Sequence, residues 1–360
     1  MNIMLFPRIL AKTGVGNHVA QLAQELARMG HKVVVVSSTN ELNVGDENVK
    51  FIPVTADTHN PLQILNTVHQ LHRIIEENSI QVVHCHHRIS ALIMHIYTTV
   101  PAVYTLHSAN VPCDLLHRTL SFGGDINIGV STEVSDFLID KLKFKPEKVV
   151  TVLNGTKDPL EDGPMTNEEM KLVKKEWEIP ADNYVYVMHC RIDEVKNHLL
   201  VVEAVHMLPE NVRNKITVLF SGLQQGEYYE KVKSTISMYG LDSCFRFVGW
   251  TSVRKAMSVS DCLLAPSFNE GFPLTTVEAF MMKVLVARSK TGGFSDQKYC
   301  LPLSVDDPQD LVNLMKNIDQ NGLGQFQDRI EDAYQFAMQE LTVRRMTEKT
   351  VEVYQKACAI

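Results

Sequence analysis

Short runs of apolar residues alternate with amphipathic segments along nearly the whole chain. Residues 31–37 form a continuous β-branched run, and residues 17–29 before it carry apolar side chains at the spacing of one helical face. Comparable runs, each expected to form a strand, occupy residues 3–6, 81–84, 102–106, 126–131, 149–153, 184–188, 216–221, 245–248, 262–265 and 284–287. Because such strands are apolar on both faces and are separated by helices, the pattern predicts an α/β fold with doubly wound parallel sheets.

The alternation is interrupted once, by a polar segment rich in glycine and proline at residues 154–183. Such a segment between two α/β blocks indicates a domain boundary. We therefore expect two Rossmann-like domains, residues 1–160 and 161–342, that face each other across a cleft. A last helix at about residues 343–358 is a candidate to pack back on the first domain.

The composition is that of an ordinary globular protein. Of the 360 residues, 45% are hydrophobic and 21% are charged, which excludes a disordered or collagen-like chain. The net charge of −7 disfavours a nucleic-acid partner. Seven scattered cysteines with no CxxC pair disfavour a disulfide framework and a cysteine-based zinc site, and they favour a reducing compartment. With no signal peptide or spanning segment indicated, a cytoplasmic location is expected.

The first candidate site is the glycine-containing segment RILAKTGVGNH, in which Gly14 and Gly16 are expected just ahead of the helix at 17–29. Two glycines let the backbone approach a ligand closely, and a helix start offers free N–H groups to an anion. The dinucleotide fingerprint is absent, because Val19 stands where a third glycine would be. A loop without a ligand remains the alternative.

A second candidate site is the segment PSFNEGFP at residues 266–273, followed by an expected helix at 274–282. Pro273 suits the first helical position, and three backbone amides behind it could then bind an anion: those of Leu274, Thr275 and Thr276. Glu270 before the helix and Glu278 inside it are placed to bind hydroxyl groups of a sugar and a ribose. Alternatively, Glu270 caps the helix and Glu278 is solvated.

Two cations, Arg191 and Lys196, follow the expected strand at 184–188. A guanidinium and an ammonium at this spacing can bind a diphosphate and neutralise it as a leaving group. Taken alone the pair is weak evidence, since solvated Arg and Lys are more common.

Taken together and in this order, these features resemble glycosyltransferase family 4, a large retaining group with the GT-B fold. The resemblance covers nearly the whole chain and includes VVHCHH (82–87), TLHS (105–108), GVS (129–131), LNG (153–155), FVGW (247–250) and TGG (291–293). Its most specific element is the pair Glu270 and Glu278, separated by seven residues.

The resemblance implies a role for each matching residue. His107 would face the donor sugar, Arg191 and Lys196 would hold the departing diphosphate, Glu270 the sugar hydroxyls and Glu278 the ribose. The full set expected to bind the donor is Gly14, Gly16, Arg191, Lys196, Glu270, Gly271, Phe272, Pro273, Leu274, Thr275 and Glu278, and the expected catalytic residues are His107, Arg191, Lys196 and Glu270. Family members need no metal, so no metal or other cofactor is expected.

The sequence departs from the family pattern at several positions. His189 and Cys190 replace the usual glycine before Arg191. Asn197 and Lys283 stand where glycine is frequent. Asp296 occupies a position where glutamate is more usual. These departures leave the donor sugar and its base open.

Clustered histidines, His84, His86 and His87 around Cys85, also permit a zinc interpretation. In a strand, His84 and His86 share one face, and a third ligand would come from His95 or His107. The alternatives are histidines at the end of a strand that faces the donor, as the resemblance implies, or purely structural histidines.

Four lysines lie close together near apolar residues at 136–148: Lys141, Lys143, Lys145 and Lys148. They could contact an anionic membrane surface, or they could simply be solvated.

The sequence thus predicts a retaining glycosyltransferase that moves a sugar from a nucleotide-diphosphate sugar, by preference a UDP-sugar, to a saccharide or lipid-linked saccharide. Bacterial surface polysaccharide, lipopolysaccharide or glycolipid synthesis is the expected setting. The alternatives are a sugar-nucleotide epimerase or hydrolase on the same fold, and a nucleotide- or glycan-binding protein without turnover.

Overall fold

A computed structural model of the chain describes residues 1–58, 60–96, 100–114 and 121–360. It divides into two compact units, unit 1 with Met1–Thr156 and Glu340–Ile360, and unit 2 with Lys157–Gln339. The first boundary lies inside the polar segment singled out above, a few residues before the expected position. The chain returns to unit 1 at Glu340, slightly earlier than expected.

Unit 1 is built on a seven-stranded sheet in the order β3-β2-β1-β4-β5-β6-β7, and every pairing is parallel. Its strands are β1 (Asn2–Phe6), β2 (Lys32–Ser37), β3 (Val49–Pro53), β4 (Val82–Cys85), β5 (Ala102–Leu106), β6 (Ile126–Gly129) and β7 (Val149–Thr151). The helices described in it are α1 (Gly14–Arg28), α2 (Pro61–Glu77), α3 (Arg88–Ile96), α5 (Thr132–Asp140) and α14 (Val343–Cys358).

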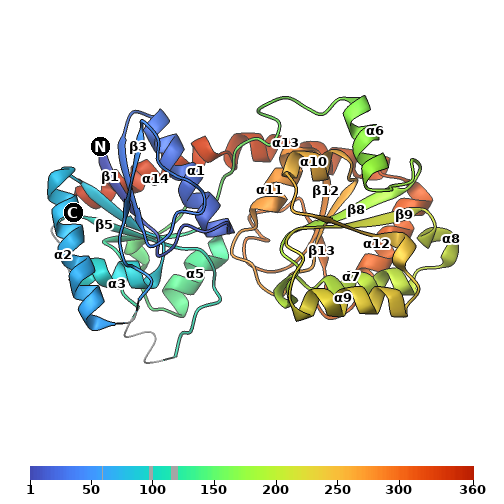
Figure 1. Cartoon of the computed structure of the whole chain (residues 1–360), viewed down its shortest axis with the longest axis horizontal. Helices are drawn as coiled ribbons and strands as arrows, with labels where there is room; N and C mark the ends of the chain where they lie inside the picture. The colour runs from blue at the N-terminus through green and yellow to red at the C-terminus, as the bar shows by residue number, and fades with distance from the viewer. Residues whose placement is uncertain (59, 97–99, 115–120) are drawn as a thin grey trace. The chain divides into compact units, whose positions relative to one another are not determined.

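The C-terminal helix α14 completes one face of the sheet of unit 1. It contacts α1 and also β4, β5 and β6 (Figure 1). Because side chains alternate along a strand, residues such as Ile3 and Leu5 of β1 point to this face, where they form one core with α1 and α14. Helix α3 packs on β4 and β5 and contacts α2.

Unit 2 has a six-stranded parallel sheet in the order β10-β9-β8-β11-β12-β13. Its strands are β8 (Tyr184–His189), β9 (Ile216–Ser221), β10 (Phe245–Gly249), β11 (Cys262–Ala265), β12 (Leu285–Ser289) and β13 (Leu301–Leu303). Its helices are α6 (Asn167–Glu176), α7 (His198–Met207), α8 (Glu210–Arg213), α9 (Glu227–Met238), α10 (Val253–Ser258), α11 (Leu274–Met281), α12 (Gln309–Asn321) and α13 (Gln327–Glu340).

Both faces of this second sheet are covered by helices. α7, α9 and α12 contribute to one large core, and α10 and α11 lie on the opposite side of the strands (Figure 1). The predicted doubly wound α/β class with parallel sheets is therefore confirmed in each unit. Two strands were not predicted, β3 and β13, and each forms an edge of its sheet. The expected strands at 126–131 and 149–153 end two residues earlier.

The sheet topology determines where each candidate residue lies. In parallel α/β sheets, ligand sites form beyond the carboxyl ends of the strands. In unit 1, β4 leads to His86 and β5 leads to His107. In unit 2, β8 leads to Arg191, β11 leads to Glu270, and β12 leads to the TGG segment.

Candidate functional site

Gly14 and Gly16 lie in the first turn of α1, so the expectation that they precede the helix is wrong. Thr13 is the N-cap, and its hydroxyl accepts a hydrogen bond from the Gly16 amide. A Cβ on Gly16 would lie 1.9 Å from the carbonyl oxygen of Ala11, whereas one on Gly14 would meet no atom within 4 Å. Gly16 is thus required by the backbone itself, and Gly14 leaves space open in front of the helix.

His107 lies just beyond β5 and is half-buried. It lines a pocket of about 440 Å³ in unit 1, together with Arg8, Val15, His86 and Arg88. Burial, and then the nearby His18, lower the pKa of His107 well below its usual range. At neutral pH this ring is therefore uncharged, so it can exchange hydrogen bonds with a ligand but cannot serve as a cation.

The zinc interpretation based on His84 does not hold. His84 and His86 do share one face, with ring centres 4.1 Å apart. However, Nδ1 of His84 lies 2.7 Å from the Tyr354 hydroxyl, and Nε2 lies 2.6 Å from Oγ1 of Thr105. Both nitrogens are thereby occupied. His95, one of the two suggested third ligands, instead stacks on Phe122.

In unit 2, Lys196 and Glu270 form a half-buried ion pair with 2.6 Å between Nζ and Oε1. The side chain of Lys196 is 21% exposed and that of Glu270 is 14% exposed. Asp193 caps the turn that carries Lys196 by accepting from the Lys196 amide. Burial lowers the pKa of Lys196, but the charge of Glu270 and its hydrogen bond outweigh this effect, so the net shift is upward. Lys196 therefore remains charged at neutral pH.

Arg191, the other cation expected to bind the diphosphate, is in a different environment. Its side chain is 62% exposed and pairs with Asp193 at 3.1 Å. Exposed pairs of this kind contribute little stability, so Arg191 can be redirected towards a ligand at low cost.

The segment after β11 leads into α11. Pro273 is the N-cap of this helix and Leu274 its first residue, so the expectation that Pro273 occupies the first helical position is wrong by one residue. The amides of Leu274, Thr275 and Thr276 still form the first turn. Phe272 is buried, and Glu278 is half-buried on the helix.

A buried arginine that the sequence analysis missed supports this loop. Arg288 is fully buried at the end of β12, where it donates to the carbonyl oxygens of Thr291 and Gly292 and to Gln297. Gln297 in turn donates to the Pro273 carbonyl. A Cβ on Gly292 would lie 2.4 Å from the Glu270 carbonyl oxygen, so the two loops are in direct contact. The sequence did contain a signal for this residue, an arginine within an apolar strand. Arginine is rarely buried without partners, so such a position indicates a paired, structural arginine.

Two of the departures from the family pattern have a common backbone explanation. Asn197 has φ 60° and Lys283 has φ 55°, a left-handed conformation that glycine adopts most easily. Asn tolerates this conformation better than most residues, and the side chain of Asn197 donates to the carbonyl oxygens of Pro266 and Val305. Lys283 pairs with Glu331 at 2.7 Å and lies over the ring of Tyr334.

The lysine segment at 141–148 has two half-buried aromatic residues in or near it, Phe137 and Phe144. Lys141, Lys143 and Lys145 are exposed, but Leu138 and Leu142 are buried. Within the described ranges, no helix has the length and hydropathy to cross a bilayer.

Two family models match the chain. Residues 12–158 match the model described as "Glycosyltransferase Family 4", and residues 169–298 match "Glycosyl transferases group 1". An uncharacterised glycosyltransferase of Methanocaldococcus jannaschii is 22% identical, with 81% of this chain and 79% of that protein aligned. A phosphatidylinositol N-acetylglucosaminyltransferase subunit of Saccharomyces cerevisiae is also 22% identical, with 95% and 79% aligned.

Solved structures agree with these matches at the level of fold. The Anabaena protein HepE in complex with UDP superposes with a TM-score of 0.86 at 16% identity, covering 99% of this chain and all of that chain. WaaG, a glycosyltransferase involved in lipopolysaccharide biosynthesis, superposes with a TM-score of 0.74 at 16% identity, covering 98% and 99%. Both units therefore have the architecture of GT-B enzymes.

Proposed function

This chain belongs to glycosyltransferase family 4, group 1, with the GT-B fold, and from that membership we propose that it transfers a sugar, with retention, from a UDP-sugar to an acceptor hydroxyl. The acceptor is a saccharide or a lipid-linked saccharide, and the setting is the cytoplasmic synthesis of a bacterial surface polysaccharide, lipopolysaccharide or glycolipid.

The observation that carries the proposal is the pairing of Lys196 with Glu270 next to the first turn of α11. A charged lysine and three helix amides suit a diphosphate, and a carboxylate beside them suits the hydroxyls of the attached sugar. When the donor binds, Lys196 exchanges its contact with Glu270 for the diphosphate, and Glu270 becomes available to the sugar.

UDP as the nucleotide is supported by the solved complexes of HepE with UDP and with UDP-glucose. A lipid-linked acceptor is supported by the name of the yeast relative, which acts on phosphatidylinositol. A lipopolysaccharide acceptor is supported by the fold shared with WaaG.

The reaction proposed is attack by the acceptor hydroxyl on the same face of the sugar from which the diphosphate leaves. The new bond joins the acceptor oxygen to the anomeric carbon, the diphosphate departs with the electron pair of the broken bond, and its departing oxygen takes up the proton of the acceptor hydroxyl. Lys196, Arg191 and the α11 amides stabilise the charge that develops on it. We assign His107, which is uncharged, to a hydrogen bond with the donor sugar. We expect this machinery to work without a metal ion.

The test is a thermal-shift panel of nucleotide sugars followed by a transfer assay in EDTA with candidate acceptors. A ligand at 100 times its Kd should add about 2.7 kcal/mol to stability. Product that keeps the anomeric configuration supports the proposal. Conversion of the donor without an acceptor would favour an epimerase or hydrolase, and binding without any turnover would favour a binding protein.

A further inference from the structure

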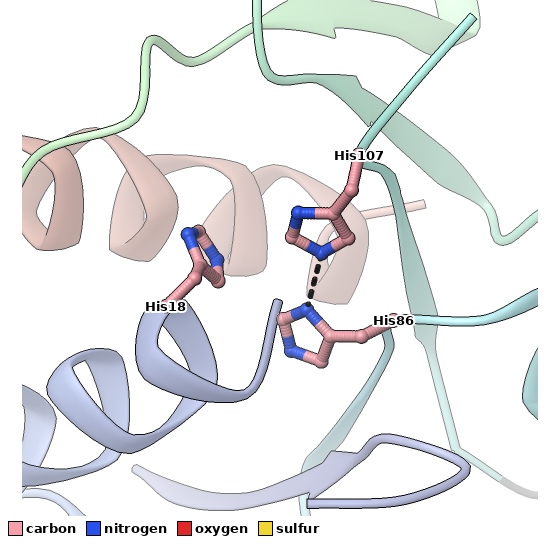
Figure 2. Close-up of side chains that lie close together, drawn as sticks. All are labelled: His18, His86 and His107. Atoms are coloured by element: carbon pink, nitrogen blue, oxygen red, sulfur yellow. Dashed lines mark hydrogen bonds between the residues drawn. The ribbon is translucent and has the colours of Figure 1, made fainter. Parts of the chain in front are cut away.

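Three histidine rings converge on one point in unit 1, and the proposed reaction uses only one of them (Figure 2). His18 projects from α1, His86 follows β4 and His107 follows β5. Nδ1 of His86 lies 3.2 Å from Nε2 of His107. The ring centres of His18 and His107 are 4.8 Å apart, and those of the other two pairs are 5.5 Å apart. One nitrogen of each ring lies within 4.8 Å of a nitrogen of each of the other two.

The strand register brings these rings together. Leu5 pairs with His84 and His84 pairs with Val103, so these side chains share the face that α1 covers. Because strand side chains alternate, the positions two residues beyond His84 and four beyond Val103 continue on that face. These are His86 and His107. His18, in the second turn of α1, meets them from the helix.

The rings hold buried nitrogens that the protein itself does not satisfy. Within the described part of the chain, neither nitrogen of His18 nor Nε2 of His86 has a hydrogen-bond partner. Only 5% of His18 and 2% of His86 is exposed. An unsatisfied buried polar atom lowers stability, so a ligand that engages a nitrogen of His18 would recover part of that stability.

The rings are also in the form that binds metal ions. Burial lowers the pKa of His18 to about 4 and those of His86 and His107 well below the usual range. All three are uncharged at neutral pH, and a metal ion would not have to displace a proton from them.

We propose that His18, His86 and His107 form a binding site for one divalent ion of the zinc class. A tetrahedral zinc ion about 2.0–2.1 Å from each nitrogen requires nitrogens about 3.3 Å apart and ring centres about 5 Å apart. The ring centres lie 4.8–5.5 Å apart, and Nδ1 of His86 and Nε2 of His107 are already 3.2 Å apart. The other nitrogens lie within 4.8 Å of one another, so side-chain rotations must shorten those separations, and the ion would replace the hydrogen bond between His86 and His107. Three imidazoles suit Zn²⁺, Cu²⁺ or Ni²⁺, whereas Mg²⁺ prefers oxygen ligands.

The surroundings supply the other elements of such a site. Oδ1 of Asn154 is buried near His18 and has no hydrogen bond of good geometry among the described residues. A small rotation would let His18 donate to it from one nitrogen and bind the ion with the other, the usual outer-shell arrangement for a metal-bound histidine. His86 and His107 line the pocket of unit 1, which offers an entry path and room for water as the fourth ligand.

The consequence for activity rests on the proposed function. A bound ion holds His107, which then cannot contact the donor sugar, so zinc should inhibit transfer.

The first test uses the wild-type protein, stripped with a chelator and titrated with Zn²⁺, Co²⁺ or Mg²⁺. We expect one Zn²⁺ per chain by calorimetry, a tetrahedral Co²⁺ spectrum, no Mg²⁺ binding, and an X-ray absorption signal from three imidazoles at about 2.0 Å. No Zn²⁺ binding would overturn the proposal. So would sulfur at about 2.3 Å, which would point to the exposed Cys113 or Cys358.

The second test compares His18→Gln with the control His87→Gln. His87 lines the same pocket but lies outside the cluster. Changes in the outer shell of a metal site typically weaken binding about 10- to 100-fold. Loss of the direct ligand in His18→Gln should weaken Zn²⁺ binding by more than that, and the His87→Gln control should bind Zn²⁺ as wild type does. Equal affinities for both variants would overturn the site. Circular dichroism checks folding, and His86→Gln replaces His18→Gln if the latter does not fold.

The activity measurement separates the two proposals. Zinc inhibition in wild type that is lost in His18→Gln supports both. Zinc that binds without inhibiting would overturn the role of His107 in transfer and leave the metal site intact. Transfer by a protein that binds no zinc would overturn the metal site and leave the proposed function intact.

Discussion

The histidine cluster of unit 1 and the Lys196–Glu270 pair of unit 2 show two opposite ways of holding polar groups in a protein interior. The histidines are uncharged because burial lowers their pKa values, and several of their nitrogens lack partners in the described chain. Lys196 is half-buried but stays charged, because the carboxylate of Glu270 lies 2.6 Å away.

This difference has a chemical meaning. The lysine of a charged pair can exchange its carboxylate partner for a diphosphate without gaining or losing a proton. This property suits the binding and release of an anion. Uncharged, unpartnered rings gain most from a ligand that brings its own charge or hydrogen bonds. The ligands that we propose for the two units therefore differ in kind.

The largest expected effect follows from removing the cation of the pair. Lys196→Ala should reduce turnover on the order of 100-fold or more, by analogy with the loss of one preorganised contact to a developing charge. Steady-state transfer assays measure it.

A matched control exists in the same unit. Lys215 pairs with Asp319 at 2.8 Å, but its side chain is 56% exposed, so Lys215→Ala should leave turnover near wild type. Activity of Lys196→Ala within about threefold of wild type would exclude it from the leaving-group contact, since one such contact is worth far more.

The central strands could be predicted from sequence because they are buried on both faces and read as unbroken apolar runs. At the sheet edges the outcome was mixed, because β7 and β10 were predicted whereas β3 and β13 were not. In β3 a lysine interrupts the apolar residues, and β13 has only three residues with a proline in the middle, so neither is an unbroken apolar run. The start of α1 was misplaced for a related reason. Glycine normally signals a loop, but Gly16 is in the helix because the Ala11 carbonyl excludes any side chain there.

The residues of the candidate site could be predicted only where they belong to short sequence motifs. Spacing singled out Arg191, Lys196, Glu270 and Glu278, but it carried no information that Lys196 pairs with Glu270 across 74 positions. His18 was missed because it is a single histidine in an amphipathic helix. Only the register of β1, β4 and β5 shows that α1 brings it to His86 and His107.

The second expected effect distinguishes the two glutamates. Glu278 is assigned to the ribose, which does not react, so Glu278→Gln should raise KM about tenfold with little change in kcat, as expected for a lost charged hydrogen bond. Glu270 is assigned to the sugar that reacts, so Glu270→Gln should lower kcat. Steady-state kinetics with varied donor concentration separates these outcomes.

Free UDP provides the control for this pair. Glu278→Gln should weaken its binding. Glu270→Gln should not, and could even tighten it, because Lys196 would no longer be held by a carboxylate. If both variants lose UDP affinity equally, the two roles have been misassigned.

The third effect concerns acid stability next to the charged pair. Burial, and then the charge of Lys196, lower the pKa of His198 to about 3. Between pH 6.5 and about 3 the unfolded chain binds a proton at His198 that the folded chain does not, so stability falls as the pH falls through this window. The slope is up to about 1.4 kcal/mol per pH unit.

His198→Phe should remove this contribution while keeping the aromatic packing on Phe220. Urea unfolding of unit 2 between pH 7 and pH 5 measures it, with His198→Gln as a second variant. If all three proteins show the same slope, His198 is not the group that titrates.

The smallest effect concerns the backbone that supports the charged pair. Asn197 and Lys283 both have positive φ, and a left-handed conformation costs a non-glycine residue about 1–2 kcal/mol. Lys283→Gly relieves this cost but loses one exposed ion pair and adds freedom to the unfolded chain, so its stability should stay within about 1 kcal/mol of wild type.

Asn197→Gly also loses the hydrogen bonds to Pro266 and Val305, and it should destabilise unit 2 by about 1–3 kcal/mol. Chemical denaturation of the two variants side by side measures the difference. If Asn197→Gly were as stable as Lys283→Gly, the hydrogen bonds of the Asn197 side chain would contribute nothing measurable to the stability of unit 2.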